Sequence, residues 1–158
     1  MLSKIDRVQI AVPDAQAAAQ GWIDLLDAEP DGRDRVAGLG ASRLSLRVGT
    51  GIVEFLQPDG VGVVADAVGA RGAHLFAAGA SASDMEGLTA RLAAKGVAPL
   101  AQGGQLHLNE DNTGVAGFRL VLSEAKARPR VGLIDFFYEA TILSANRDGL
   151  MSHLNDLL

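Results

Sequence analysis

The chain has 158 residues, no cysteine and a formal net charge of −5, from 14 Lys and Arg against 19 Asp and Glu. With 48% hydrophobic residues it is expected to fold around its own core, while the acidic balance argues against partners such as nucleic acid or an anionic membrane. The lack of cysteine excludes disulfides and thiolate metal ligands, and the N-terminus shows no signal-peptide pattern, so we expect a cytoplasmic protein.

The first third of the chain predicts a β-α-β-β-β unit. Residues 5–12 alternate between an apolar face and a face that carries Arg7 and Gln9, which is typical of a strand. Asp14 can cap the helix that follows, because apolar residues continue at helical spacing to residue 27. Three short strands are expected next, over residues 34–38, 42–48 and 52–57.

The same order of elements repeats after a short connecting helix over residues 61–70. A strand is expected over 74–80, and the capping box that begins at Ser83 starts a helix that ends at Gly96. Three more strands are expected over residues 97–102, 105–109 and 118–122. Internal repetition of this kind predicts one domain over residues 1–124, built from modules at about 4–58 and 72–124.

The C-terminal segment begins with a polar linker over residues 125–131. Residues 132–158 predict an apolar strand over 134–143 and then a helix, either as an ordinary C-terminal addition or as the start of a third module. The second interpretation implies that the chain is the front part of a longer protein. An apolar strand and helix need a cover in either case, so we expect a homodimer that uses this segment.

The paired units, together with the segments Ile5–Asp14 and Gly51–Pro58, resemble the vicinal oxygen chelate superfamily of glyoxalases, bleomycin-resistance proteins and extradiol dioxygenases. The resemblance covers residues 4–124. It implies an α/β (α+β) fold in which paired β-α-β-β-β modules form a curved, cup-shaped mixed sheet, here with a C-terminal strand and helix added. It also implies a small-molecule ligand, with lyase, isomerase or dioxygenase chemistry in the members that hold a divalent metal such as Fe, Mn, Zn or Ni.

The metal-ligand positions that the resemblance implies fall on Arg7, Glu54, Ala77 and Leu120. A guanidinium offers no lone pair to a metal, and neither alanine nor leucine can act as a ligand. Glu54 matches, and His74 would join it if its strand contained a bulge. We therefore favour no metal cofactor, with Glu54 and His74 as the ligands if one binds.

Arg7, Gln9 and Glu54 are predicted to face one another inside the cup. In one interpretation Arg7 and Glu54 form an ion pair that fills a former metal site. In the other, Arg7 and Gln9 bind an anionic substrate and Glu54 is the catalytic residue. Arg47 and His107 are further candidates for substrate binding, the alternative for each being a solvated surface. The predicted function is action on, or binding of, a small anionic organic molecule; the alternative is a metal-free binding module or a non-catalytic front domain of a longer protein.

Overall fold

The computed structural model describes residues 2–158. Eight strands form one mixed sheet in the order β2-β3-β4-β1-β5-β8-β7-β6. The strands are β1 (Leu2–Ala11), β2 (Glu29–Val36), β3 (Ala41–Val48), β4 (Gly51–Pro58), β5 (His74–Ala82), β6 (Leu100–Gln102), β7 (Gln105–Leu108) and β8 (Leu120–Glu124). The helices are α1 (Ala15–Leu26), the 3₁₀ turn η1 (Ala37–Leu39), α2 (Val63–Arg71), α3 (Met85–Ala94), α4 (Glu110–Thr113) and α5 (Arg147–Leu157).

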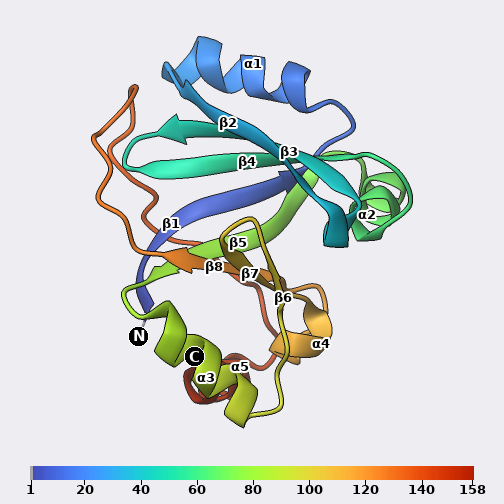
Figure 1. Ribbon diagram of the computed structural model, residues 1–158, viewed down its shortest axis with the longest axis vertical. Coiled ribbons are helices and arrows are strands. Elements are labelled where there is room, and N and C mark those ends of the chain that lie inside the picture. The colour runs from blue at the N-terminus through green and yellow to red at the C-terminus, as the bar shows by residue number, and fades with distance from the viewer. Residues whose placement is uncertain (1) are drawn as a thin grey trace.

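The predicted fold class of paired β-α-β-β-β modules is confirmed, and the two units join at the centre of the sheet. In each module the first and last strands are parallel, β1 with β4 and β5 with β8, while the remaining pairs are antiparallel. Strands β1 and β5 run antiparallel, with Gln9 opposite Ala77 and Arg7 opposite Gly79. Figure 1 shows the result: α1 covers the half of the sheet that contains β2–β4, and α3 covers the half that contains β5–β8.

Equivalent aspartates begin the main helix of each module. The Asp14 side chain accepts a hydrogen bond from the backbone N–H of Ala17 at 2.9 Å, and Asp84 accepts one from Gly87 at 2.8 Å. Such caps satisfy backbone donors that the first turn of a helix leaves free. Each helix then packs apolar side chains onto the outer face of its half of the sheet, so that the inner face is left for other side chains.

The predicted strand over Ile134–Leu143 is wrong, since these residues have no regular secondary structure. The apolar residues of this stretch divide between two surroundings. Ile134 and Phe137 pack against the core under α1, whereas Phe136 is 59% exposed. The backbone here touches the body at single points, such as the hydrogen bond from Thr50 N–H to the Asp135 carbonyl, and does not pair with a sheet edge.

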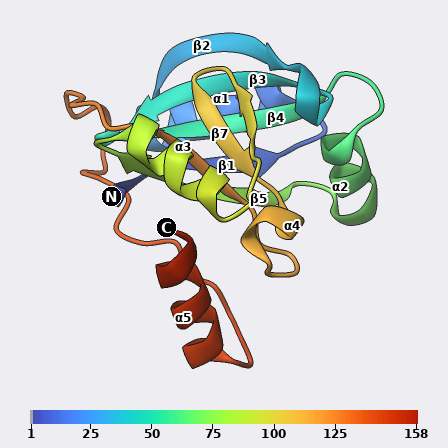
Figure 2. The same cartoon turned by 60° about the horizontal axis from the view of Figure 1, so that its bottom comes forward.

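The C-terminal helix forms as expected and is attached near its end. Leu157 is buried in the core under α3, and Arg91 of α3 donates to the backbone carbonyls of Asn155 and Asp156. Figure 2 shows α5 standing away from the sheet below the rest of the molecule. Within residues 2–158 there is no helix with both the length and the apolar character needed to cross a membrane.

Two smaller differences from the predicted elements concern boundaries, and a third is an additional helix. Strand β2 begins at Glu29, five residues before the predicted start, because it pairs with the whole length of β3. Strand β6 has three residues where six were expected. The short helix α4 was not predicted; Asn109 and Asn112 hold it by reciprocal side-chain-to-backbone hydrogen bonds of 2.9 and 3.2 Å.

Candidate functional site

Glu54 lies at the centre of the inner face of the sheet, and its side chain is 3% exposed. Its Oε1 atom accepts hydrogen bonds from Arg7 Nη1 at 2.8 Å and Gln105 Nε2 at 2.6 Å, and its Oε2 accepts one from Gln9 Nε2 at 2.8 Å. Arg43 Nη1 adds an ion pair at 3.5 Å. A buried carboxylate is tolerated when donors satisfy it in this way. The expected contact between Arg7 and Glu54 is therefore present.

Arg7 is engaged on all three of its side-chain nitrogens. Besides Glu54, it meets the fully buried carboxylate of Asp6, from Nε at 3.3 Å and from Nη2 at 3.4 Å. Arg128, from the segment after β8, donates to the same carboxylate at 3.0 Å. The guanidinium of Arg7 is thus a fixed internal counter-ion for two carboxylates, which leaves it poorly placed to hold an anionic substrate as well.

The register of the sheet places the second-module equivalents of the charged residues. Gln9 lies opposite Glu54 on β4, and its counterpart Gly79 lies opposite Val121 on β8. The position of the second module that corresponds to Glu54 is therefore Val121, not Leu120 as the resemblance implied. Leu120 belongs to the core under α3, on the outer face. Neither residue can coordinate a metal, so the correction leaves the chemistry of the position unchanged.

His74 lies on the inner face after all, because β5 carries the bulge that the prediction required. The pairing shifts between Gln9 and Ile10, so that His74 lies opposite Ala11. Its Nδ1 atom is 2.9 Å from the Gly72 carbonyl oxygen. Across residues 2–158, however, no three His, Asp or Glu side chains gather as a metal site would require. With Arg7, Ala77 and Val121 in three ligand positions and Glu54 held by four donors, the donor set does not fit a divalent metal.

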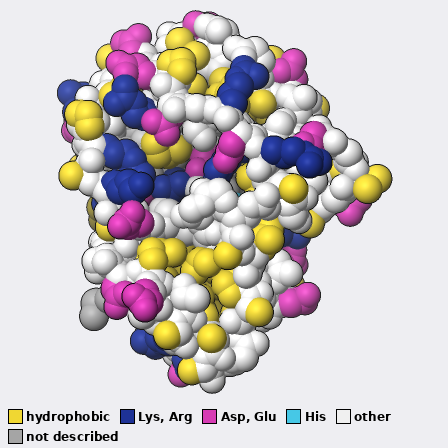
Figure 3. Space-filling model, in the orientation of Figure 1, with side chains coloured by type: hydrophobic (Ala, Val, Ile, Leu, Met, Phe, Trp, Pro, Cys, Tyr) yellow, Lys and Arg dark blue, Asp and Glu magenta, His cyan; other side chains and the backbone are white. Residues whose placement is uncertain are grey.

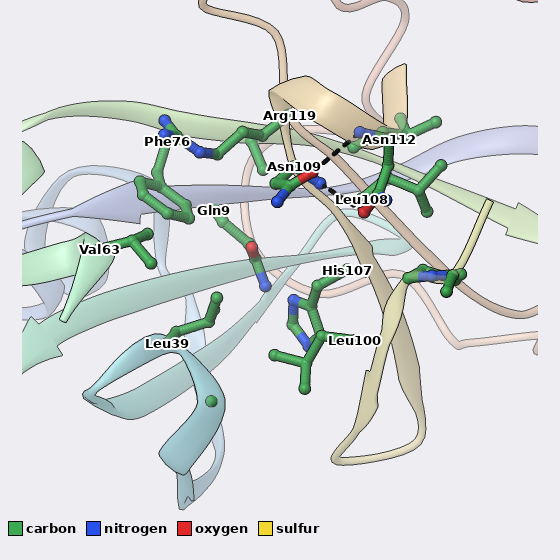
Figure 4. Close-up of a pocket in the computed structure, with 15 residues that line it drawn as sticks. Gln9, Leu39, Val63, Phe76, Leu100, His107, Leu108, Asn109, Asn112 and Arg119 are labelled. Atoms are coloured by element: carbon green, nitrogen blue, oxygen red, sulfur yellow. Dashed lines mark hydrogen bonds between the residues drawn. The ribbon is translucent and has the colours of Figure 1, made fainter. Parts of the chain in front are cut away.

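A cavity of about 280 Å³ opens on the inner face, beside the Glu54 cluster. Its walls are mostly apolar, and Figure 4 shows the Gln9 side chain pointing toward the His107 ring within it. The labelled lining residues are Gln9, Leu39, Val63, Phe76, Leu100, His107, Leu108, Asn109, Asn112 and Arg119. A concave, largely apolar cavity with a few polar groups is the usual form of a small-molecule site.

Three side chains on this cavity carry buried polar atoms without a hydrogen-bond partner in the described part of the chain. They are Gln9 Oε1, His107 Nε2 and Arg119 Nε. Buried polar groups are nearly always paired, so three unpaired atoms on one cavity indicate a place for a bound molecule. Gln9 and His107 were candidates from the sequence, whereas Arg119 was missed. Residues 119 and 121 lie on the same face of an extended strand, so the inward position of Val121 places Arg119 on the inner face as well.

Burial governs the protonation of His107. The ring is 7% exposed, and loss of hydration lowers its pKa below the ordinary value, as do the nearby charges of Arg43 and Arg7. The negative charge of Glu54 and a backbone hydrogen bond at Gln102 act in the opposite direction without reversing the shift in pKa. The imidazole is therefore neutral near pH 7.

The two arginines of β3 have different roles. Arg47 pairs with Glu29 at the edge of the sheet, and its side chain is 31% exposed. It does not line the cavity. Arg43 is the buried one: its Nε donates to Asp34 at 2.8 Å, and its Nη1 donates to Gln105. The sequence analysis selected Arg47, whereas Arg43 is the buried arginine. Alternation along a strand gives the face on which a side chain lies, but it does not tell which positions on that face are covered by the rest of the sheet.

A second, polar hollow of about 320 Å³ lies on the other side of the Glu54 cluster. The charges on its wall nearly balance. The cations are Arg7, Arg43, Lys126 and Arg128, and the carboxylates are Asp31, Glu54 and Glu124. Figure 3 shows basic and acidic side chains lying beside one another over the upper half of this face. Neither hollow therefore presents an excess of free positive charge.

The paired modules, the curled sheet and a cavity on its inner face define a cup-shaped small-molecule fold with a buried ion-pair cluster where a metal would lie. A family model described as the Glyoxalase/Bleomycin resistance protein/Dioxygenase superfamily matches residues 6–116. The chain belongs to this superfamily, which confirms the resemblance seen in the sequence.

Solved structures of the same fold include methylmalonyl-CoA epimerase from Mycobacterium tuberculosis, with a TM-score of 0.65 and 20% identity over 79% of this chain and 90% of that one. A variant of the Streptomyces coelicolor epimerase in complex with 2-nitronate-propionyl-CoA gives 0.65 and 19%, over 82% and 100%. A hypothetical protein from Bacillus halodurans C-125 gives 0.62 and 18%, over 80% and 97%. At these identities the likeness shows the fold alone. Comparison with curated proteins gave no match.

Proposed function

We propose that this chain binds a small organic molecule in the cavity beside Gln9 and His107, without a divalent metal. The observation that carries the proposal is the set of three unpaired polar atoms on one cavity wall, from Gln9, His107 and Arg119. Left without a ligand, each would carry a desolvation cost of roughly 1–3 kcal/mol. A bound molecule with matching groups removes that cost, and the apolar walls supply the remaining affinity.

In this proposal Glu54 is a positioning residue and not a general base. Its two oxygens accept three hydrogen bonds and an ion pair, and each of these stabilises the charged carboxylate. Both oxygens are therefore already engaged with donors of the chain itself. The contribution of Glu54 is to fix the Gln9 amide, whose nitrogen it binds and whose oxygen it thereby leaves for the ligand.

Proton transfer of the isomerase type is the second candidate function, and His107 favours it. A neutral imidazole with an unpaired Nε2 on the cavity wall is suited to take a proton from a bound molecule. Epimerases of this fold have been solved with methylmalonyl-CoA or its analogues. Exchange of deuterium from solvent into a bound ligand, abolished in His107→Phe, would distinguish catalysis from binding.

We also propose that the protein is a cytoplasmic homodimer, with the C-terminal segment in the interface. The apolar side chains of this segment remain exposed, Leu133 at 63%, Phe136 at 59% and Leu143 at 95%. A second copy of the chain would cover them. Light scattering on the full chain and on a variant without residues 131–158 tests this: the full chain should have the mass of a dimer and the shorter one that of a monomer. An unchanged dimeric mass would contradict it.

Ligand-detected NMR on chelator-treated protein tests the proposed binding function. A mixture of small aromatic and aliphatic compounds should contain binders that are lost in Ala77→Phe, which fills the cavity from β5, and in Leu100→Trp, which fills it from β6. Leu75→Phe is the matched control, because Leu75 lies on the same strand, is 56% exposed and is not part of the cavity. Binders that survive both filling variants, or binding that requires added metal, would contradict the proposal.

A further inference from the structure

We infer that the ligand of this cavity is a neutral molecule that presents an N–H or O–H donor to Gln9 and His107 and a carbonyl acceptor to Arg119, with a carboxamide as the simplest class. The inference rests on the proposed function and gives the chemical character of its ligand. It departs from the anionic ligand that the sequence suggested.

The orientation of the Gln9 amide is settled by its neighbour. Glu54 Oε2 lies 2.8 Å from the Gln9 nitrogen, and an ionised carboxylate can only accept hydrogen bonds. The amide NH₂ group must therefore point to Glu54, which leaves Oε1 on the cavity side. That oxygen is buried and has no partner within residues 2–158. It is an acceptor that needs a donor from the ligand.

His107 offers a second acceptor beside it. A backbone hydrogen bond at Gln102 favours the protonated ring, so the ring donates it, and Nε2 has no partner in the region described. The donor is therefore Nδ1–H, and in a neutral imidazole this leaves Nε2 with a free lone pair. Figure 4 shows the Gln9 amide beside this ring, with the amide nitrogen turned toward it, so both side chains belong to the same part of the cavity wall.

Arg119 supplies a buried donor that has no partner in the described part of the chain. Its guanidinium lies 4.8 Å from the centre of the Phe76 ring, and its Nη2 pairs with Glu110 at 2.8 Å, but Nε is buried without a partner. Glu110 balances the charge of Arg119, so the cavity carries little net charge. A carboxylate ligand has no hydrogen to donate to the two unpaired acceptors, Gln9 Oε1 and His107 Nε2, whereas a carboxamide can donate to them and accept from Arg119.

Benzamide and benzoate test this, because they have nearly the same shape and differ in the donor. In protein-detected NMR titrations at pH 7.5 we expect benzamide to bind at least about 10-fold more tightly than benzoate. The reason is that the anion would place its oxygens against buried acceptors to which it cannot donate. The preference should shrink in His107→Phe. It should persist in His74→Phe, which removes another imidazole with an unpaired Nε2 outside the cavity.

Benzoate that binds as tightly as benzamide, or more tightly, would overturn the inference. Toluene serves as the third probe, because it fills the cavity without any polar group. If toluene shifts the resonances of the cavity residues but benzamide has no advantage over benzoate, the inference fails and the proposed binding function stands. If none of the three probes shifts these resonances, the proposed function fails as well.

Discussion

The two modules of this protein have the same order of strands and helices, but the side chains at the centre of their inner faces differ in size and charge. The first module places Arg7, Gln9, Arg43 and Glu54 on the inside of the cup, while the second places Ala77, Gly79 and Val121 at the equivalent central positions. A metal site shared between modules needs ligands from both. Here one module supplies both charges of an ion pair, which neutralises the site within that module. The second module contributes uncharged polar groups instead, such as Gln105, which donates to Glu54.

The asymmetry has a packing reason as well as an electrostatic one. A Cβ atom placed on Gly79 would lie 2.0 Å from Cγ of Arg7 and 2.8 Å from its carbonyl oxygen. The long side chain of Arg7 crosses onto the partner strand at the place where the second module has no side chain. The long side chain of Arg7 in the first module thus requires a residue without a side chain, Gly79, on the neighbouring strand of the second.

The largest effect is expected from removing the charge that the first module keeps inside. Arg7→Met leaves the carboxylates of Glu54 and Asp6 buried with fewer partners, and should cost about 3–5 kcal/mol of unfolding free energy in chemical denaturation. Adding Glu54→Gln should recover part of this loss, with a coupling energy of at least about 1 kcal/mol. Additive losses in the double variant would mean that the pair does not interact.

A smaller effect is expected from enlarging the second module. Gly79→Ala should lower the unfolding free energy by about 1–3 kcal/mol, because the methyl group meets the backbone of Arg7 and not only its flexible side chain. Gly69→Ala is the control, since a Cβ atom there has nothing within 4 Å and the residue is helical. Equal stability of the two variants would contradict the close approach of Arg7 to β5.

The pH dependence of stability tests the burial of His107 on the inner face of the second module. The pKa of His107 is lowered on folding by burial, so the unfolded chain takes up a proton near its ordinary value of about 6.5 before the folded chain does. The unfolded state then binds more protons, and stability falls as the pH drops through this region. Wild type should lose more stability than His107→Phe between pH 7.5 and 5; parallel losses would place the pKa of His107 at its ordinary value.

The sequence allowed the parts of the fold that rest on local pattern to be predicted. The alternation around Arg7 and Gln9 and the aspartate caps at Asp14 and Asp84 were enough for the two modules and for the contact with Glu54. The register between β5 and β8 was harder to predict, and the residue opposite Gly79 is Val121, not Leu120. The length of the loop before β8 does not tell at which residue the pairing begins.

The remaining misses have a common physical origin in tertiary packing. The segment Ile134–Leu143 has the composition of a strand but no regular secondary structure. It packs Ile134 and Phe137 against the core under α1 without pairing its backbone with a strand of the sheet. Arg43 and Arg47 occupy equivalent places in an alternating strand, and the closure of the cup decides which is buried. Arg119 stands one residue before its strand, and the sequence gives no indication of the cavity beneath it.

The metal content of the protein tests the central claim most directly, namely that an internal ion pair replaces a metal in this cup. The full chain and Glu54→Gln should be incubated with Fe, Mn, Ni or Zn, desalted, and measured by elemental analysis. We predict far less than one metal per chain in both, because three of the four ligand positions hold Arg7, Ala77 and Val121. About one metal per chain in the wild type, lost in Glu54→Gln, would contradict the account and make His74 the next ligand to test.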